Sequence, residues 1–292
     1  MVLVMTIMQP DITKIPAQYR DVLTRNARRV VALQLTGVPE KKGTANSCCR
    51  WLRWLIGVPE KKGTADAAEP TSSRVGGLAF VTDDYPEPRD SDGNRMIFLA
   101  QLNLAKLPPL EGYPTEGLLQ FFIADDDLLG LEYNKYNKLV GGSGSFVVRL
   151  IPASELGRGR LAKASQSEYT PVSGGYFTVN GVLYDQLPKP KDKDFGAATG
   201  IDWYSEDPEF EAIFDYLYEF PQSVYGAGWA TFTQEDPRDS NSELELLFQL
   251  DYEVDKGVQV MFGDGGVVNF FITREDLTQR NFHNAAYNWD CS

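Results

Sequence analysis

The sequence predicts an α+β fold made mostly of antiparallel β-sheet with a few helices, built as two related halves from an internal duplication. Short apolar runs between turns dominate the chain, and 26 Gly and 17 Pro supply those turns. Only two stretches show a clear helical spacing of apolar residues. Three blocks of the first half recur in the second: Gly77 as Gly226, 101–103 as 249–251, and 117–123 as 266–272. Three recurrences at nearly one spacing favour duplication over coincidence.

The elements of the N-terminal part follow from this spacing. Residues 16–27 predict a helix, because Val22, Leu23 and Ala27 lie near helical spacing and Pro16 stands at its N-terminal position. Residues 29–36 predict a strand. Further strands are predicted at 77–81, 96–102, 117–123, 146–151 and 176–183, the last with a hairpin signal at Asn180-Gly181.

The C-terminal part repeats the strand pattern after one more helix. Residues 208–220 place Phe210, Ile213, Phe214 and Leu217 on one helical face, which predicts an amphipathic helix. Strands are then predicted at 244–251, 258–262 and 267–273.

Composition divides the chain into five parts within one compact domain over about 11–292. These are an N-terminal helix and strand (1–36), a loop with a tandem 20-residue insertion (37–66), a first half-repeat (70–150), a loop-rich connector (153–206) and a second half-repeat (207–292). The insertion is inferred from the literal recurrence of GVPEKKGTA at 37–45 and 57–65, and loops tolerate insertions because closure entropy rises only logarithmically with length. The alternatives for residues 38–57 are an exposed Trp/Arg/Leu surface for a partner or a membrane, and a cloning or gene-model artefact.

Charge and composition exclude several classes of partner. The chain has 28 Lys and Arg against 41 Asp and Glu, a net charge of -13. Such a chain repels phosphate backbones, so we expect no nucleic-acid partner, whereas a basic protein partner is compatible. We also expect no signal peptide, no membrane span and no disulfide framework, since the apolar runs are short and there are three cysteines. A cytoplasmic protein fits these features best.

The chain is poor in residues that carry chemistry. It has one histidine, His283, and the sequence holds no Cys-x-x-Cys pair, nucleophile elbow or phosphate loop. The consecutive Asp125, Asp126 and Asp127 favour a solvated turn over a calcium site. We expect no metal, no cofactor and no catalytic residues, so the sequence leaves enzymatic activity open and leans against it.

Paired polar residues remain as candidates for a binding site. The segment TQEDPR places Glu235, Asp236 and Arg238 in a loop, as a local ion pair or an exposed acid/base set. In the two related strands, Gln101 with Asn103 and Gln249 with Asp251 share one face, while Leu102 and Leu250 face the core. These pairs line the wet face of a sheet or, if the halves pack with two-fold symmetry, converge on a ligand at their junction. The candidate ligand- or partner-binding set is Arg74, Gln101, Asn103, Glu235, Asp236, Arg238, Gln249 and Asp251.

Several blocks together resemble the YwqG-like bacterial family of unknown function. They are SRVGGLAF (73–80), IFLAQLNLAKLP (97–108), GLLQFFI (117–123), FTQEDPR (232–238), LLFQLDYE (246–253) and MFGDGGVVNFFITREDLTQRNF (261–282). The resemblance implies a cytoplasmic α+β protein with internal duplication and no established enzymatic activity. Relatives near toxin–immunity loci imply an immunity role by analogy. The chain departs from the family at VTDDYPEPRD, at Gly226-Ala-Gly228-Trp229 and in the 38–57 insertion.

The sequence favours one function and leaves a second open. The first is a non-enzymatic protein-interaction module, immunity-like in one form, that binds a basic partner through an acidic face. The alternative is a small-ligand-binding protein or weak carboxylate-based enzyme with its site between the halves, where Glu235 or Asp236 would be the general acid or base. The identity of the partner or ligand, any reaction and the oligomeric state are left open.

Overall fold

A curved, largely antiparallel sheet forms the body of the protein in a computed structural model, which describes residues 7–40, 69–131, 144–163, 167, 169–202, 204, 208–219 and 221–292. Its strands follow the order β16-β15-β12-β11-β2-β10-β3-β5-β6-β7, and the short β1 pairs in parallel with β10. The bounds are β1 (Ile7–Met8), β2 (Arg28–Pro39), β3 (Arg74–Gly76), β5 (Ile97–Asn103), β6 (Leu118–Ile123), β7 (Phe146–Ile151), β10 (Gly175–Gln186), β11 (Val224–Tyr225), β12 (Leu244–Leu250), β15 (Val267–Thr273) and β16 (Ala286–Asp290). The predicted, mostly antiparallel sheet is confirmed.

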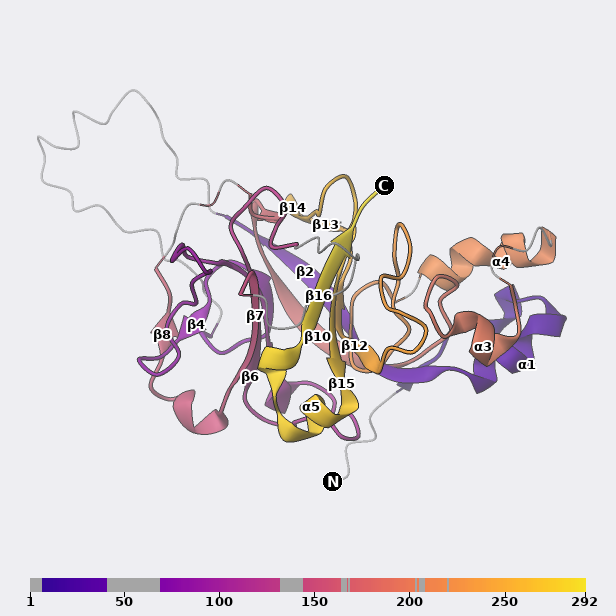
Figure 1. The fold of residues 1–292 in the computed structure, drawn as a ribbon, viewed down its shortest axis with the longest axis horizontal. Helices are drawn as coiled ribbons and strands as arrows, with labels where there is room; N and C mark the ends of the chain where they lie inside the picture. Colours follow the sequence, from indigo (N-terminus) through magenta and orange to yellow (C-terminus); the bar gives the residue numbers. More distant parts are fainter. Residues whose placement is uncertain are drawn as a thin grey trace, which may run out of the picture.

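The sheet curls into a nearly closed barrel, with β7 and β16 as its two end strands (Figure 1). Aromatic side chains from distant strands meet inside it. Phe121 of β6 stacks on Phe248 of β12 with ring centroids 4.3 Å apart. Phe146 of β7 lies 5.3 Å from Tyr287 of β16, so the end strands approach one another through their side chains. Large buried aromatic surfaces of this kind dominate the energetics of a core.

Smaller elements surround the barrel. A three-stranded sheet contains β13 (Glu253–Asp255), β14 (Val258–Val260) and β9 (Val172–Ser173), and a two-stranded sheet contains β4 (Phe80–Val81) and β8 (Arg160–Leu161). Short 3-10 turns are η1 (Ile12–Lys14), η2 (Leu104–Lys106), η3 (Ala153–Glu155) and η4 (Phe282–Asn284).

Three of the four helices in the described residues form a layer beside the barrel (Figure 1). They are α1 (Ala17–Arg25), α3 (Phe195–Thr199) and α4 (Pro208–Glu219), whereas α5 (Arg274–Gln279) directly follows β15. The helical layer has its own apolar cluster, in which Phe210, Ile213 and Leu217 of α4 are buried against Leu23 and Phe195. Within the described ranges, no helix is both long enough and apolar enough to cross a membrane.

Most predicted elements agree with the observed ones. The strand predicted at 77–81 is wrong in its bounds, because the structure has two short strands there, β3 (Arg74–Gly76) and β4 (Phe80–Val81). The helices at 16–27 and 208–220 are confirmed as α1 and α4, and the strands at 146–151 and 267–273 have the predicted bounds. The hairpin at Asn180-Gly181 is wrong, because β10 continues straight through these residues and pairs Asn180 with Gln34. A Cβ at Gly181 would lie 2.6 Å from side-chain atoms of Leu107 and Val31, so close packing explains this glycine.

The segment 153–206, expected as a loop-rich connector, contains the centre of the sheet. Strand β10 has 12 residues and pairs along its whole length with β2. Strand β2 itself runs to Pro39, beyond the expected strand end at residue 36. Most of the 37–66 loop, including both vicinal cysteines, lies outside the described residues.

Candidate functional site

The predicted polar pairs lie in two separate groups. Gln101 and Asn103 are on β5, Gln249 is on β12, and Asp251 follows it directly. Between β5 and β12 lie the four strands β11, β2, β10 and β3. The intervening Leu102 and Leu250 are fully buried in the barrel core, which confirms their predicted orientation. The polar side chains therefore point away from the barrel interior.

In the first half, these side chains bond the residues on either side of strand β3. The Gln101 Oε1 accepts the Phe80 N–H at 3.1 Å, and its Nε2 donates to the Ser72 carbonyl at 2.8 Å. Gln120, the neighbour of Gln101 on β6, donates to the Phe80 carbonyl at 2.8 Å. Asn103 Nδ2 donates to the Thr71 carbonyl at 2.9 Å. The amide groups thus supply hydrogen-bond partners to backbone groups of Thr71, Ser72 and Phe80.

Arg74 belongs to the same arrangement. Its guanidinium donates to the Glu69 carbonyl at 2.8 Å and lies over the Tyr176 ring, 5.5 Å from the centroid. Arg74 is fully buried, so its observed contacts anchor the start of strand β3.

The second half repeats these contacts. The Gln249 Oε1 accepts the Thr231 N–H at 2.8 Å, and its amide donates to the Gln222 carbonyl. Asn269, the neighbour of Gln249 on β15, donates to the Thr231 carbonyl at 3.0 Å. The Asp251 N–H donates to Ser223 Oγ at 3.1 Å. Gln249 and Asn269 therefore have the contacts that Gln101 and Gln120 have in the first half.

Asp251 differs from its counterpart Asn103 because a buried lysine lies near it. Burial lowers the pKa of Lys189 to about 7, and the charge of Asp251 acts in the opposite direction. Burial raises the pKa of Asp251 to about 6, against the Tyr252 N–H and the attraction of Lys189. The Lys189 ammonium donates to the carbonyl of Leu217 in the last turn of α4. This lysine thereby connects α4 to the sheet.

Asp236 and Arg238 form a buried ion network with Asp192. Arg238 Nη2 lies 2.8 Å from Asp192 Oδ2 and 2.7 Å from Asp236 Oδ2, and all three side chains are almost completely buried. Burial disfavours the charged guanidinium, but the two carboxylates hold the pKa of Arg238 above its ordinary value. Asp192 also accepts the Ala230 N–H at 2.8 Å, and Arg238 donates to the Leu244 carbonyl at 3.1 Å. The local ion pair, one of the two predicted alternatives, is therefore present.

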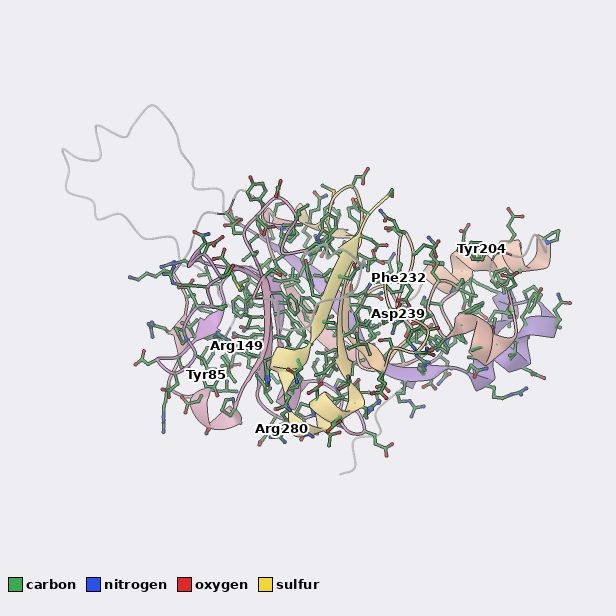
Figure 2. All side chains as sticks on the ribbon, viewed as in Figure 1. Tyr85, Arg149, Tyr204, Phe232, Asp239 and Arg280 are labelled. Atoms are coloured by element: carbon green, nitrogen blue, oxygen red, sulfur yellow. The ribbon has the colours of Figure 1, made fainter. Side chains whose placement is uncertain are left out.

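Next to this network is a hollow of about 660 Å³, hereafter the polar hollow. Glu235 stands at it, and its two carboxylate oxygens each lie 3.3 Å from the Tyr204 hydroxyl. Figure 2 shows Tyr204 close to α4, with Phe232 and Asp239 on loops between the barrel and the helices. The lining residues are Lys191, Asp192, Lys193, Gly196, Gly200, Ile201, Asp202, Tyr204, Glu235, Asp236, Arg238 and Ser240.

The polar hollow thus brings together the predicted Glu235, Asp236 and Arg238, with Gln249 and Asp251 in the same half of the sheet. Arg74, Gln101 and Asn103 lie in the other half. In the described part of the chain, no three His, Cys, Asp or Glu side chains are placed to hold a metal ion.

The matched region of the chain covers both groups of polar residues. The family described as "Domain of unknown function (DUF1963)" matches residues 73–291, about three quarters of the chain. The chain belongs to this family. The DUF1963 region begins at β3 and ends just after β16, so α1 and β2 precede it. No curated protein shows significant sequence similarity to this DUF1963 chain.

Sequence reasoning missed Lys189, Asp192 and Tyr204 of the DUF1963 chain. Lys189 and Asp192 belong to the run PKPKDKD at 188–194, whose charges and prolines are typical of a solvated loop. Both are buried instead. The partner of Asp192 is Arg238, and only the folded chain brings these two positions together.

Proposed function

We propose that this DUF1963 protein is a non-enzymatic interaction module that binds a basic protein partner at the polar hollow. The observation that carries the proposal is the contrast between two neighbouring carboxylates. Asp236 is buried and neutralised by Arg238, whereas the exposed Glu235 is contacted by the neutral hydroxyl of Tyr204. Asp202, also exposed, lines the same hollow. Exposed carboxylates of this kind attract and orient a cationic partner.

The charged groups behind the polar hollow favour binding over catalysis. Arg238, Asp192 and Asp236 satisfy one another, and Asp192 and Arg238 are also bonded to backbone groups. Groups that are fully engaged in this way stabilise the hollow and are poorly placed to transfer protons.

A direct binding measurement tests this proposal. The probe is a fluorescein-labelled basic peptide, titrated with the protein and followed by fluorescence anisotropy at low and at moderate salt. We expect binding that weakens with salt and that falls roughly fivefold in the double variant Asp202→Asn/Glu235→Gln. The matched control is Glu111→Gln/Glu116→Gln, which removes two exposed charges from the loop between β5 and β6. Absence of binding, or an equal loss in the control, would overturn the proposal.

A second function, a small-ligand-binding protein or weak carboxylate-based enzyme, is favoured by one observation. Burial brings the pKa values of Lys189 and Asp251 to about 7 and about 6, and such shifts are frequent at functional sites. Thermal-shift measurements with agmatine, glucose and ATP test it. A stabilisation that disappears in Asp251→Asn supports this function, and a blank with all three probes counts against it.

We infer further that the two halves descend from one duplicated unit. Support comes from the matched contacts of Gln101 and Gln249 and from the sheet order, in which β3-β5-β6-β7 and β11-β12-β15-β16 flank the central β2–β10 pair. We also propose a narrower relationship to YwqG-like proteins, an immunity-like role and a cytoplasmic location. The sequence blocks support the relationship, and the immunity-like role follows from it by analogy alone. The three cysteines support the location.

A further inference from the structure

The polar hollow combines an exposed aromatic ring with carboxylates. Tyr204 is 67% exposed, and its hydroxyl lies 3.3 Å from each oxygen of Glu235. Its backbone N–H donates to Asp202 Oδ1 at 3.0 Å, which fixes the second carboxylate beside the same residue. A ring next to negative charge is a recognised site for organic cations, because the face of the ring is itself electronegative.

The cations that line the polar hollow already have partners. Lys191 Nζ donates to the Thr233 carbonyl at 2.6 Å, and Lys193 Nζ lies 2.7 Å from Asp194. Arg238 is held between Asp192 and Asp236. The lining therefore presents the carboxylates of Asp202 and Glu235 to an incoming group, and charge complementarity selects a cation.

The fold already places its own arginines against aromatic rings and oxygen acceptors, a carboxylate for Arg28 and amide and backbone oxygens for Arg149. The Arg28 guanidinium lies 3.6 Å from the centroid of the Trp229 ring, and its Nη2 is 3.4 Å from Asp194. Arg149 lies 5.0 Å from the Phe122 ring and 6.0 Å from the Tyr85 ring, and Figure 2 shows it beside Tyr85. A guanidinium suits these surroundings because it is planar and stacks on a ring while its edge donates to oxygen atoms.

We propose that the polar hollow recognises an arginine side chain of the basic partner, with the Tyr204 ring as the stacking surface and Glu235 and Asp202 as acceptors. The inference rests on the proposed function and adds the identity of the recognised group. A lysine ammonium would have the same charge, but it lacks the planar surface and the forked donors.

Two peptides of equal charge and length test this inference. The probes are fluorescein-labelled Gly-Arg-Gly-Arg-Gly-Arg-Gly and its counterpart with lysine at each arginine position, titrated by anisotropy under identical salt. We expect the arginine peptide to bind about fivefold more tightly. Tyr204→Leu should remove most of this preference, and Tyr204→Phe should keep most of it, because the ring is retained.

The control variant is Tyr252→Leu, which removes a tyrosine that is 43% exposed and is not among the lining residues. The melting temperature of each variant establishes that the fold is intact. Equal affinity for the two peptides, or an undiminished preference in Tyr204→Leu, would overturn the arginine assignment while leaving the proposed function standing. Failure of both peptides to bind would overturn the proposed function as well.

Discussion

Replacing Lys189 by methionine tests the electrostatics of the contact between α4 and the sheet. Lys189 is fully buried and its ammonium donates to the Leu217 carbonyl. Methionine has a similar length and no charge, so Lys189→Met removes the buried titration with little change in volume. We expect this variant to lose a specific pH dependence of the stability that the wild type has.

The sign and size of the effect follow from the pKa of Lys189, which burial lowers from 10.5 to about 7. Between these values the unfolded chain binds one proton more than the folded chain, so the free energy of unfolding rises with pH. The slope is about 1.4 kcal/mol per pH unit, or on the order of 5 kcal/mol over the whole interval. Below pH 7 the folded protein carries the full cost of the buried charge, and Asp251 offsets part of it.

The assay is urea denaturation at several pH values between 7.5 and 9.5. This window lies above the pKa of about 6 for Asp251 and below pH 10, where tyrosines ionise in the unfolded chain. The control is Lys106→Met, at an exposed lysine that pairs with Glu69. We expect the free energy of unfolding to rise with pH equally in the wild type and in Lys106→Met. In Lys189→Met its slope against pH should be lower by about 1.4 kcal/mol per pH unit, which corresponds to one bound proton. Equal slopes in all three proteins would refute the reasoning.

Further substitutions test the structural roles of Arg238, Gln249 and Gln101 by the same denaturation assay. Arg238→Met leaves Asp192 and Asp236 buried without their cation, and we expect a loss of about 3–5 kcal/mol, against at most about 1 kcal/mol for Arg29→Met in the exposed pair with Asp185. A small loss for Arg238→Met would show that its carboxylates find other partners. Gln249→Leu leaves the Thr231 N–H and the Gln222 carbonyl unpaired and should cost about 2–4 kcal/mol. Gln101→Leu should cost a similar amount, because it breaks the matching bonds, and a clear difference between the two would contradict their equivalence.

The sequence pattern predicted β5, β6, β7, β12 and β15 to within one residue at each end, because each is a strongly apolar run. It missed short elements whose stability depends on their surroundings. Strand β16, AYNWD, has little alternation and lies at an end of the sheet. Helix α5 has six residues, and its signal is the cap at Thr273, whose side chain accepts the Asp276 N–H. That Thr-x-x-Asp spacing was available in the sequence and is a recognised helix start.

The polar pairs show what a strand pattern leaves undetermined. Alternation correctly placed Gln101 and Gln249 on the face opposite the core, but it does not reveal what covers that face. In the folded protein, residues on either side of the short strands β3 and β11 take up the amide groups: Ser72 and Phe80 in the first half, Gln222 and Thr231 in the second. The wet face, one of the two predicted alternatives, is therefore not what these glutamines line: both are fully buried and bond the neighbouring segments.

The glutamine contacts occur in both halves of the sheet, whereas the polar hollow lies beside the second half. The shared glutamines fix segments on the sheet, and their hydrogen-bonding capacity is largely used within the fold. The polar hollow is lined instead by residues between Lys191 and Tyr204 and between Glu235 and Ser240. The first of these segments lies between the two halves of the proposed duplication. The carboxylates of Asp202 and Glu235 and the ring of Tyr204 are exposed there. Recognition is therefore better sought in the segment that departs from the repeated pattern than in the residues that define it.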